Sequence, residues 1–175
     1  TTIRGGFKVE NKQNVKFEEL AITNPHQFGN GFWLEGSETN VDVLKCAVKE
    51  CGNAGMWVGG GATVTATQCE FMENGQYGVY CQNANTNARL TECKMHHNGW
   101  SGLDACVDAV VDLHGTKTDI HSNNQDGISA EDHAKVNIHL PSQHNTTHDN
   151  VRGNRLQDRG CLLYTSDAAD EEASG

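Results

Sequence analysis

Two pairs of acidic residues have the spacing that acid–base chemistry would require. Glu10 and Glu35 are 25 positions apart, and Asp104 and Glu131 are 27 positions apart. Hydrolysis of a glycosidic bond usually needs two carboxyl groups about 5–10 Å apart, one acting as an acid and the other as a base or nucleophile. The four residues are therefore candidate catalytic groups of a carbohydrate-active enzyme. The alternative is that they are ordinary solvated charges on an exposed strand surface.

Three aromatic residues recur at nearly the same interval. Trp33, Trp57 and Tyr80 are 24 and 23 positions apart, and Asp104 follows after 24 more. Stacked on one exposed face, the aromatic rings would form a flat platform for the apolar faces of sugar rings, and an uncovered patch of this kind marks a binding site. We therefore predict Trp33, Trp57, Tyr80 and Asp104 as ligand-binding residues. Alternatively, another segment covers the rings and their stacking only stabilises the fold.

Metal ligation is not indicated by the cysteine and histidine pattern. The sequence has no Cys-x-x-Cys pair, and Cys46, Cys69 and Cys93 recur once in each of three successive repeats. Buried free thiols behave as small apolar side chains, which is the interpretation we favour for these three. His139 and His148 lack the ligand spacing of a zinc site and are predicted to be turn or surface residues.

The candidate residues are positioned by an internal repeat. Glycine followed by an apolar residue recurs at intervals of 25, 24, 23, 24 and 25 residues. These dipeptides are Gly6-Phe7, Gly31-Phe32, Gly55-Met56, Gly78-Val79, Gly102-Leu103 and Gly127-Ile128. Each is expected to open a short strand whose alternate residues face inward. A second alternating apolar pair begins nine or ten residues after each glycine, and a third, weaker element follows it.

One such coil cannot bury its own inward face. Stacking coils about 4.8 Å apart buries that face against the equivalent residues above and below. Three strands and three turns fit 23–25 residues, whereas the i, i+3, i+4 apolar spacing of a helix is absent. We therefore predict an all-β chain that forms a parallel β-helix of about six coils. Parallel crossovers are overwhelmingly right-handed, which sets its hand.

Asparagine marks one turn of successive coils. Asn74-Gly75, Asn98-Gly99 and Asn123-Asn124 fall near the same level of the repeat, as does Gly52-Asn53. Asparagine tolerates the left-handed backbone conformation of tight turns. Stacked asparagine side chains can also hydrogen-bond along the axis of a stack of strands.

The repeat has a recognisable pattern, N-x-x-G-h-x-h followed by h-x-h-x-x-C-x-h, where h is apolar. It resembles the right-handed parallel β-helix family, which includes pectate-lyase-like proteins and the carbohydrate-binding and sugar-hydrolase-type repeats of some F-box proteins. The resemblance covers roughly Thr2–Asn150. It implies a fold that is shared by lyases, hydrolases, epimerases and domains without known activity, so it does not by itself assign chemistry.

A lyase of this family would need acidic calcium ligands, as the resemblance implies. Arg89, Thr65 and Asp112 would be outward neighbours on the second strand of three coils, and Asp112 is expected to be solvated. Calcium prefers about 6–8 oxygen ligands, which these residues do not supply. We therefore predict no cofactor and no metal, with calcium considered only if the protein is a lyase.

The composition of the chain argues against two kinds of partner, nucleic acid and the interior of a membrane. The formal net charge is −10, and an acidic surface argues against nucleic acid, whose partners are usually basic. No apolar run approaches the ~18 residues that a membrane span needs. Cellular compartment and oligomeric state are not indicated by the sequence.

The C-terminal residues differ from the rest. Residues 161–171 read CLLYTSDAADE and resemble translated sequencing-adapter DNA. We expect residues 161–175 to be an artefactual, disordered tail, and residues 1–160 to be a β-helix fragment truncated at both ends and irregular from about residue 141. Without that tail, which carries four acidic and no basic residues, the net charge is −6.

The sequence as a whole favours a non-catalytic binding or scaffold domain. Its ligand would be a polysaccharide or a protein bound on an exposed strand face, because the aromatic row is present and an acid–base set is not evident. The alternative is a carbohydrate-active enzyme, namely a polysaccharide lyase, hydrolase or epimerase. In that case Asp104 with Glu131, or Glu10 with Glu35, would be the acid–base pair.

Overall fold

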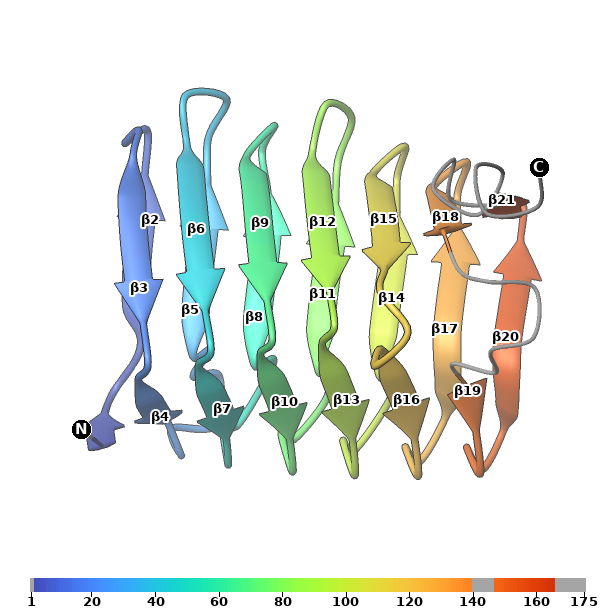
Figure 1. The fold of residues 1–175 in the computed structure, drawn as a ribbon, viewed down its shortest axis with the longest axis horizontal. Coiled ribbons are helices and arrows are strands. Elements are labelled where there is room, and N and C mark those ends of the chain that lie inside the picture. The colour runs from blue at the N-terminus through green and yellow to red at the C-terminus, as the bar shows by residue number, and fades with distance from the viewer. Residues whose placement is uncertain (1, 140–146, 166–175) are drawn as a thin grey trace, which may run out of the picture.

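The computed structural model describes residues 2–139 and 147–165 of the chain. Its strands form three parallel sheets of seven strands each, and successive coils lie side by side along the long axis (Figure 1). Each coil supplies one strand to each sheet. The predicted all-β parallel solenoid is therefore confirmed. Within the described residues, no helix has the length and apolar character that crossing a membrane requires.

The strands alternate between the three sheets in chain order. The first sheet consists of β1 (Thr2–Arg4), β4 (Ala21–Thr23), β7 (Ala47–Lys49), β10 (Glu70–Met72), β13 (Lys94–His96), β16 (Asp119–His121) and β19 (Thr147–His148). The second sheet consists of β2 (Phe7–Glu10), β5 (Phe32–Glu35), β8 (Met56–Gly59), β11 (Val79–Gln82), β14 (Leu103–Cys106), β17 (Asp126–Glu131) and β20 (Gly153–Asp158). The third sheet consists of β3 (Val15–Glu18), β6 (Asn40–Leu44), β9 (Thr63–Thr67), β12 (Asn87–Thr91), β15 (Val110–His114), β18 (Lys135–His139) and β21 (Cys161–Thr165).

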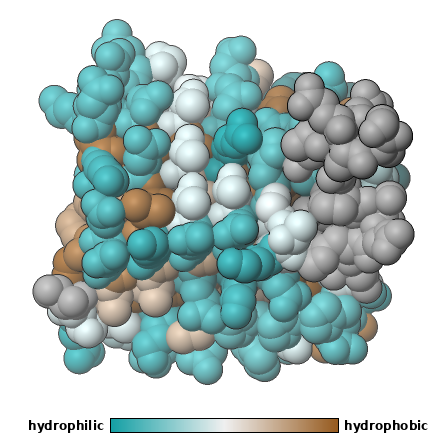
Figure 2. All heavy atoms as spheres, viewed as in Figure 1, coloured by the Kyte–Doolittle hydropathy of each residue, from teal (hydrophilic) through white to brown (hydrophobic). Residues whose placement is uncertain are grey.

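Alternation along each strand separates the core from the surface. On β5, Phe32 and Leu34 are fully buried, whereas Trp33 between them is 40% exposed. Phe32 pairs in register with Met56, which pairs with Val79, so the core residues form continuous columns. The face shown in Figure 2 is by contrast mostly hydrophilic. Burial of these columns against neighbouring coils supplies the main driving force for folding.

The repeated glycine is required by close packing between coils. A Cβ atom on Gly78 would lie 2.5 Å from the carbonyl oxygen of Gly102, and one on Gly55 would lie 2.8 Å from that of Gly78. Neither contact is possible for a real side chain. The glycines recur because at this level the backbones of successive coils leave no room for a side chain.

The predicted asparagine stack is present and fully hydrogen-bonded. Asn74 Nδ2 donates to Asn98 Oδ1 at 3.0 Å, and Asn98 Nδ2 donates to Asn123 Oδ1 at 2.9 Å. Asn123 Nδ2 continues the series to Asn150 Oδ1 at 2.8 Å. We call these four residues the asparagine ladder. Because Asn98 and Asn123 are completely buried, the first two bonds are made where water cannot readily replace them, whereas the bond to Asn150 is partly buried.

The ladder does not extend to Asn53. The backbone N–H of Cys51 donates to Asn74 Oδ1 at 3.1 Å, so Cys51 occupies the position that an asparagine takes in the later coils. The predicted cysteine column is confirmed, since Cys46, Cys69 and Cys93 are buried and none forms a disulfide.

Residues 147–165 differ from the sequence-based expectation. They form β19, β20 and β21, which pair in parallel with β16, β17 and β18. The predicted irregularity and disorder are therefore wrong for 147–165, including the first five residues of the supposed tail. Residues 166–175 lie outside the described part of the chain, and the adapter origin of 161–171 stays a prediction.

Candidate functional site

The outer face of the second sheet carries the predicted row of residues. In register along the sheet, Lys8 pairs with Trp33, Trp33 with Trp57, and Trp57 with Tyr80. Tyr80 in turn pairs with Asp104. The structure therefore brings all four predicted ligand-binding residues into one row, because their spacing matches one coil.

Trp33 and Trp57 form the more open part of this row. Their ring centroids are 5.0 Å apart with an angle of 47° between the planes. Trp33 Nε1 donates to Glu35 Oε2 at 3.1 Å, and Lys8 Nζ lies 5.8 Å from the centroid of the Trp33 ring. These contacts fix the orientation of the Trp33 ring while 40% of the residue stays exposed.

Two aromatic residues from turns extend the row, and sequence reasoning missed both. The Tyr77 ring stacks on the Tyr80 ring at 4.8 Å, and Trp100 meets Tyr77 edge-on at 5.2 Å. Trp100 is 40% exposed. Tyr77 lies one residue before its coil's glycine and Trp100 lies two residues before its own. The repeat therefore does not align them.

Asp104 is buried, which corrects its interpretation as a solvated charge. It is 8% exposed. Burial, together with the nearby negative charges of Glu131 and Asp126, raises its pKa to about 7. The ordinary value for aspartate is about 3.9. At neutral pH this carboxyl is consequently divided between its protonated and ionised forms, which is the state that a general acid needs.

The neighbours of Asp104 are held by short polar contacts. Ser129 Oγ donates to Glu131 Oε1 at 2.9 Å, and Arg152 Nη1 lies 3.5 Å from Asp126 Oδ2. Asp126 is 3% exposed, and burial raises its pKa, an effect that Arg152 opposes. We call Asp104, Asp126 and Glu131 the carboxyl cluster. Arg152 neutralises only part of its charge.

The two predicted carboxylate pairs have different surroundings. Asp104 pairs in register with Ser129, so Glu131 is its diagonal neighbour on the next strand. The Cα atoms of diagonal neighbours lie about 7–8 Å apart, so the side chains of Asp104 and Glu131 can approach each other. Glu10 and Glu35 pair directly across β2 and β5, but Glu10 is exposed and bound to Lys8 Nζ at 2.9 Å. Only the first pair includes a buried carboxyl.

A shallow hollow of about 200 Å³ adjoins the open end of the aromatic row. Phe28, Lys8 and Trp33 are among the residues that line it. Phe28 comes from the turn before β5 and is 68% exposed. An exposed aromatic side chain beside the row enlarges the apolar surface that a ligand could cover.

A group of potential metal ligands lies on a different sheet. Asp112, His114 and His139 project from the third sheet, and their ligand atoms lie within 4.8 Å of one another. Sequence reasoning expected Asp112 to be solvated and His139 to be a turn or surface residue. The sequence does contain an indication of this group, because His114 and His139 are 25 residues apart, which is the length of one coil.

The fold is a parallel β-solenoid. The aromatic row and the group of potential metal ligands lie on the outer faces of two of its three sheets. Residues 2–170 match the family described as right handed beta helix region, and the chain belongs to this family. No curated protein and no solved structure matches the chain. Family membership fixes the fold, and function must be argued from the sites.

Proposed function

We propose that the outer face of the second sheet binds a glycan chain without altering it. The observation that carries this proposal is the contact between the Trp33 and Trp57 rings, which face outward in the register of one coil. Such rings cover the apolar faces of sugars. Binding sites for small ligands combine apolar surface with a few polar groups that fix orientation.

The polar groups beside the rings favour a glycan over a protein surface. Glu35 Oε2 accepts a hydrogen bond from Trp33 Nε1, and Gln82 Oε1 accepts one from the Tyr80 hydroxyl. Each oxygen has a second lone pair that can accept a bond from a sugar hydroxyl. Aromatic faces alternating with hydrogen-bond acceptors match a ligand with apolar ring faces and many hydroxyl donors.

Replacing Trp33 with alanine should weaken polysaccharide binding about tenfold, which corresponds to a loss of ~1.4 kcal/mol. The reason is the loss of stacking area at the open end of the row. The measurement is isothermal titration with soluble xylan, galactomannan and mixed-linkage β-glucan, with polygalacturonate included as an anionic comparison. Because the chain carries a net charge of −10, the neutral polymers should bind better than the anionic one.

Tyr164→Ala is the matched control, because Tyr164 is an exposed aromatic residue on β21 of the third sheet. It should bind like the wild-type chain, and circular dichroism should be unchanged for both variants. Equal affinities of the wild-type, Trp33→Ala and Trp57→Ala chains, or no binding to any polymer, would refute the proposed glycan surface.

A second candidate function is acid–base cleavage of the bound glycan. One observation favours it, namely the pKa of Asp104, which burial raises to about 7 beside Glu131. In this scheme protonated Asp104 donates a proton to the leaving-group oxygen. Glu131, held by Ser129, acts as the base or nucleophile.

If the protein cleaves glycans, Asp104→Asn and Glu131→Gln should each lower the rate of release of reducing sugars at least ~100-fold. Activity that needs protonated Asp104 should fall as the pH rises through about 7. Glu10→Gln serves as the control and should keep full activity. Release of sugars that is insensitive to Asp104→Asn would exclude this role for the carboxyl cluster. Binding without release would leave the first proposal standing alone.

A further inference from the structure

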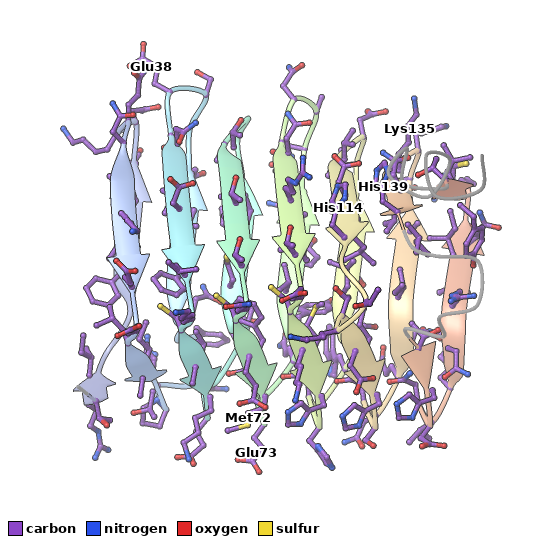
Figure 3. All side chains as sticks on the ribbon, in the orientation of Figure 1. Glu38, Met72, Glu73, His114, Lys135 and His139 are labelled. Carbon is purple, nitrogen blue, oxygen red and sulfur yellow. The ribbon has the colours of Figure 1, made fainter. Side chains whose placement is uncertain are left out.

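We propose that Asp112, His114 and His139 bind one divalent transition-metal ion of the zinc class on the outer face of the third sheet. Asp112 and His114 are alternate residues of β15 and therefore face the same side. His139 belongs to the adjacent strand β18 and pairs in register with His114. Figure 3 shows the two labelled histidines on neighbouring strands.

The three side chains already lie within reach of one another. The imidazole rings of His114 and His139 are stacked, with centroids 4.2 Å apart and planes 4° from parallel. His139 Nε2 lies 3.0 Å from Asp112 Oδ1. In a tetrahedral zinc site with metal–nitrogen bonds of about 2.0–2.1 Å, the ligand atoms are about 3.4 Å apart. Since all the ligand atoms here lie within 4.8 Å, small side-chain rotations suffice.

The ligand types identify the class of ion. Two imidazoles and one carboxylate suit zinc and neighbouring first-row metals, whereas calcium and magnesium select sites built from oxygen alone. All three residues are partly buried, with side-chain exposures of 37% for Asp112 and 25% for His139. An ion at this position would keep a coordination site open to solvent, and water could occupy it.

Neighbouring groups hold two of the ligands in place. Asn137 Nδ2 donates to Asp112 Oδ1 at 2.9 Å. The Thr165 hydroxyl lies 2.6 Å from His139 Nδ1, which leaves Nε2 of the same ring directed at Asp112. Such outer contacts orient the ligands of metal sites and fix the histidine tautomer. The contacts of Asn137 and Thr165 already limit the conformations of Asp112 and His139, so binding of the ion would cost less conformational entropy.

Two features of the surface disfavour binding of the ion. Arg89 on β12 pairs in register with Asp112, and a positive charge there lowers the affinity for any cation. The contact between His139 Nε2 and Asp112 Oδ1 must also be replaced by bonds to the metal.

The test is titration of the reduced chain with Zn²⁺ by calorimetry, together with Co²⁺ as a spectroscopic probe of the ligand set. One ion should bind per chain, and saturation should raise the melting temperature because the ion binds the folded state. Replacing His114 or His139 with glutamine should each weaken binding at least ~10-fold. Circular dichroism checks that both variants are folded.

The matched control is His121→Gln. His121 is a stacked histidine on the first sheet, with its ring 4.9 Å from that of His96, and it lies outside the proposed site. It should bind Zn²⁺ like the wild-type chain. Unchanged Zn²⁺ affinity in folded His114→Gln and His139→Gln variants would overturn the proposal. Loss of binding in His121→Gln alone, or no uptake by the wild-type chain, would do the same.

Discussion

The Asp104→Asn variant should be more stable than the wild-type chain at pH 8, by about 2–4 kcal/mol in the free energy of unfolding. Burial and the charges of Glu131 and Asp126 raise the pKa of Asp104 to about 7 in the folded protein. The unfolded value is about 3.9. Ionised Asp104 is therefore disfavoured in the folded state, and asparagine, which has nearly the same shape, removes the penalty.

The pH dependence has a definite sign. Between about pH 4 and pH 7 the folded state binds more protons at Asp104 than the unfolded state does. This group therefore makes the wild-type chain less stable as the pH rises through that window. The stability difference between Asp104→Asn and wild type should be near zero at pH 4 and reach its maximum above pH 7. Urea denaturation at a series of pH values measures it.

Asp42→Asn is the control for this experiment. Asp42 is exposed on β6, and its replacement should change stability by less than ~0.5 kcal/mol at any pH. A wild-type chain more stable than Asp104→Asn at pH 8 would contradict the proposed burial penalty. A confirmed penalty would mean that the protein retains a destabilising carboxyl, which is a frequent property of functional sites.

Asn98→Ala should destabilise the protein by about 3–5 kcal/mol, the largest loss we expect from a single polar substitution. Asn98 Oδ1 accepts from both Nδ2 and the backbone N–H of Asn74. Its own Nδ2 donates to Asn123 Oδ1 and to the carbonyl of Phe71. Alanine leaves buried donors and acceptors without these bonds, and each such group costs about 1–3 kcal/mol.

Two further variants make this test specific. Asn98→Asp keeps the acceptor but cannot donate to Asn123, so it should also be strongly destabilised at pH 7. Asn53→Ala is the control outside the asparagine ladder and should cost less than ~1 kcal/mol. Denaturation and amide hydrogen exchange around residues 74–123 measure the effect. Equal stability of Asn98→Ala and Asn53→Ala would show that the ladder contributes little.

The periodic part of the site could be predicted from the sequence, and the parts that depend on turns could not. Trp33, Trp57 and Tyr80 form a row because strand residues one coil apart must be neighbours. Tyr77 and Trp100 stand at different positions of two equally long turns, residues 73–78 and 97–102, so the repeat spacing does not align them. The burial of Asp104 was not predicted either, because spacing shows which residues are neighbours and not how far they are covered.

The seventh coil was missed because its core positions are polar. Arg155 pairs with Ile128, and Gln157 pairs with Ala130, so both occupy the register of inward-facing residues. Both are nevertheless exposed. The apolar alternation that reveals the other coils is therefore absent from β20, although the backbone pairing continues. A strand is recognised in the sequence by the alternation of apolar side chains, which follows their burial. The pairing of the strand requires only its backbone N–H and C=O groups.

The close glycine packing described above has a consequence for how such a chain can change in length over evolution. Because each coil meets its neighbours through the same glycine level and the same strand register, duplicating or deleting one whole coil of 23–25 residues restores every interface. Gaining or losing a single residue within a strand reverses which side chains face inward. Insertions and deletions of whole coils are thus expected to be tolerated, whereas shorter insertions and deletions should be tolerated only in the turns.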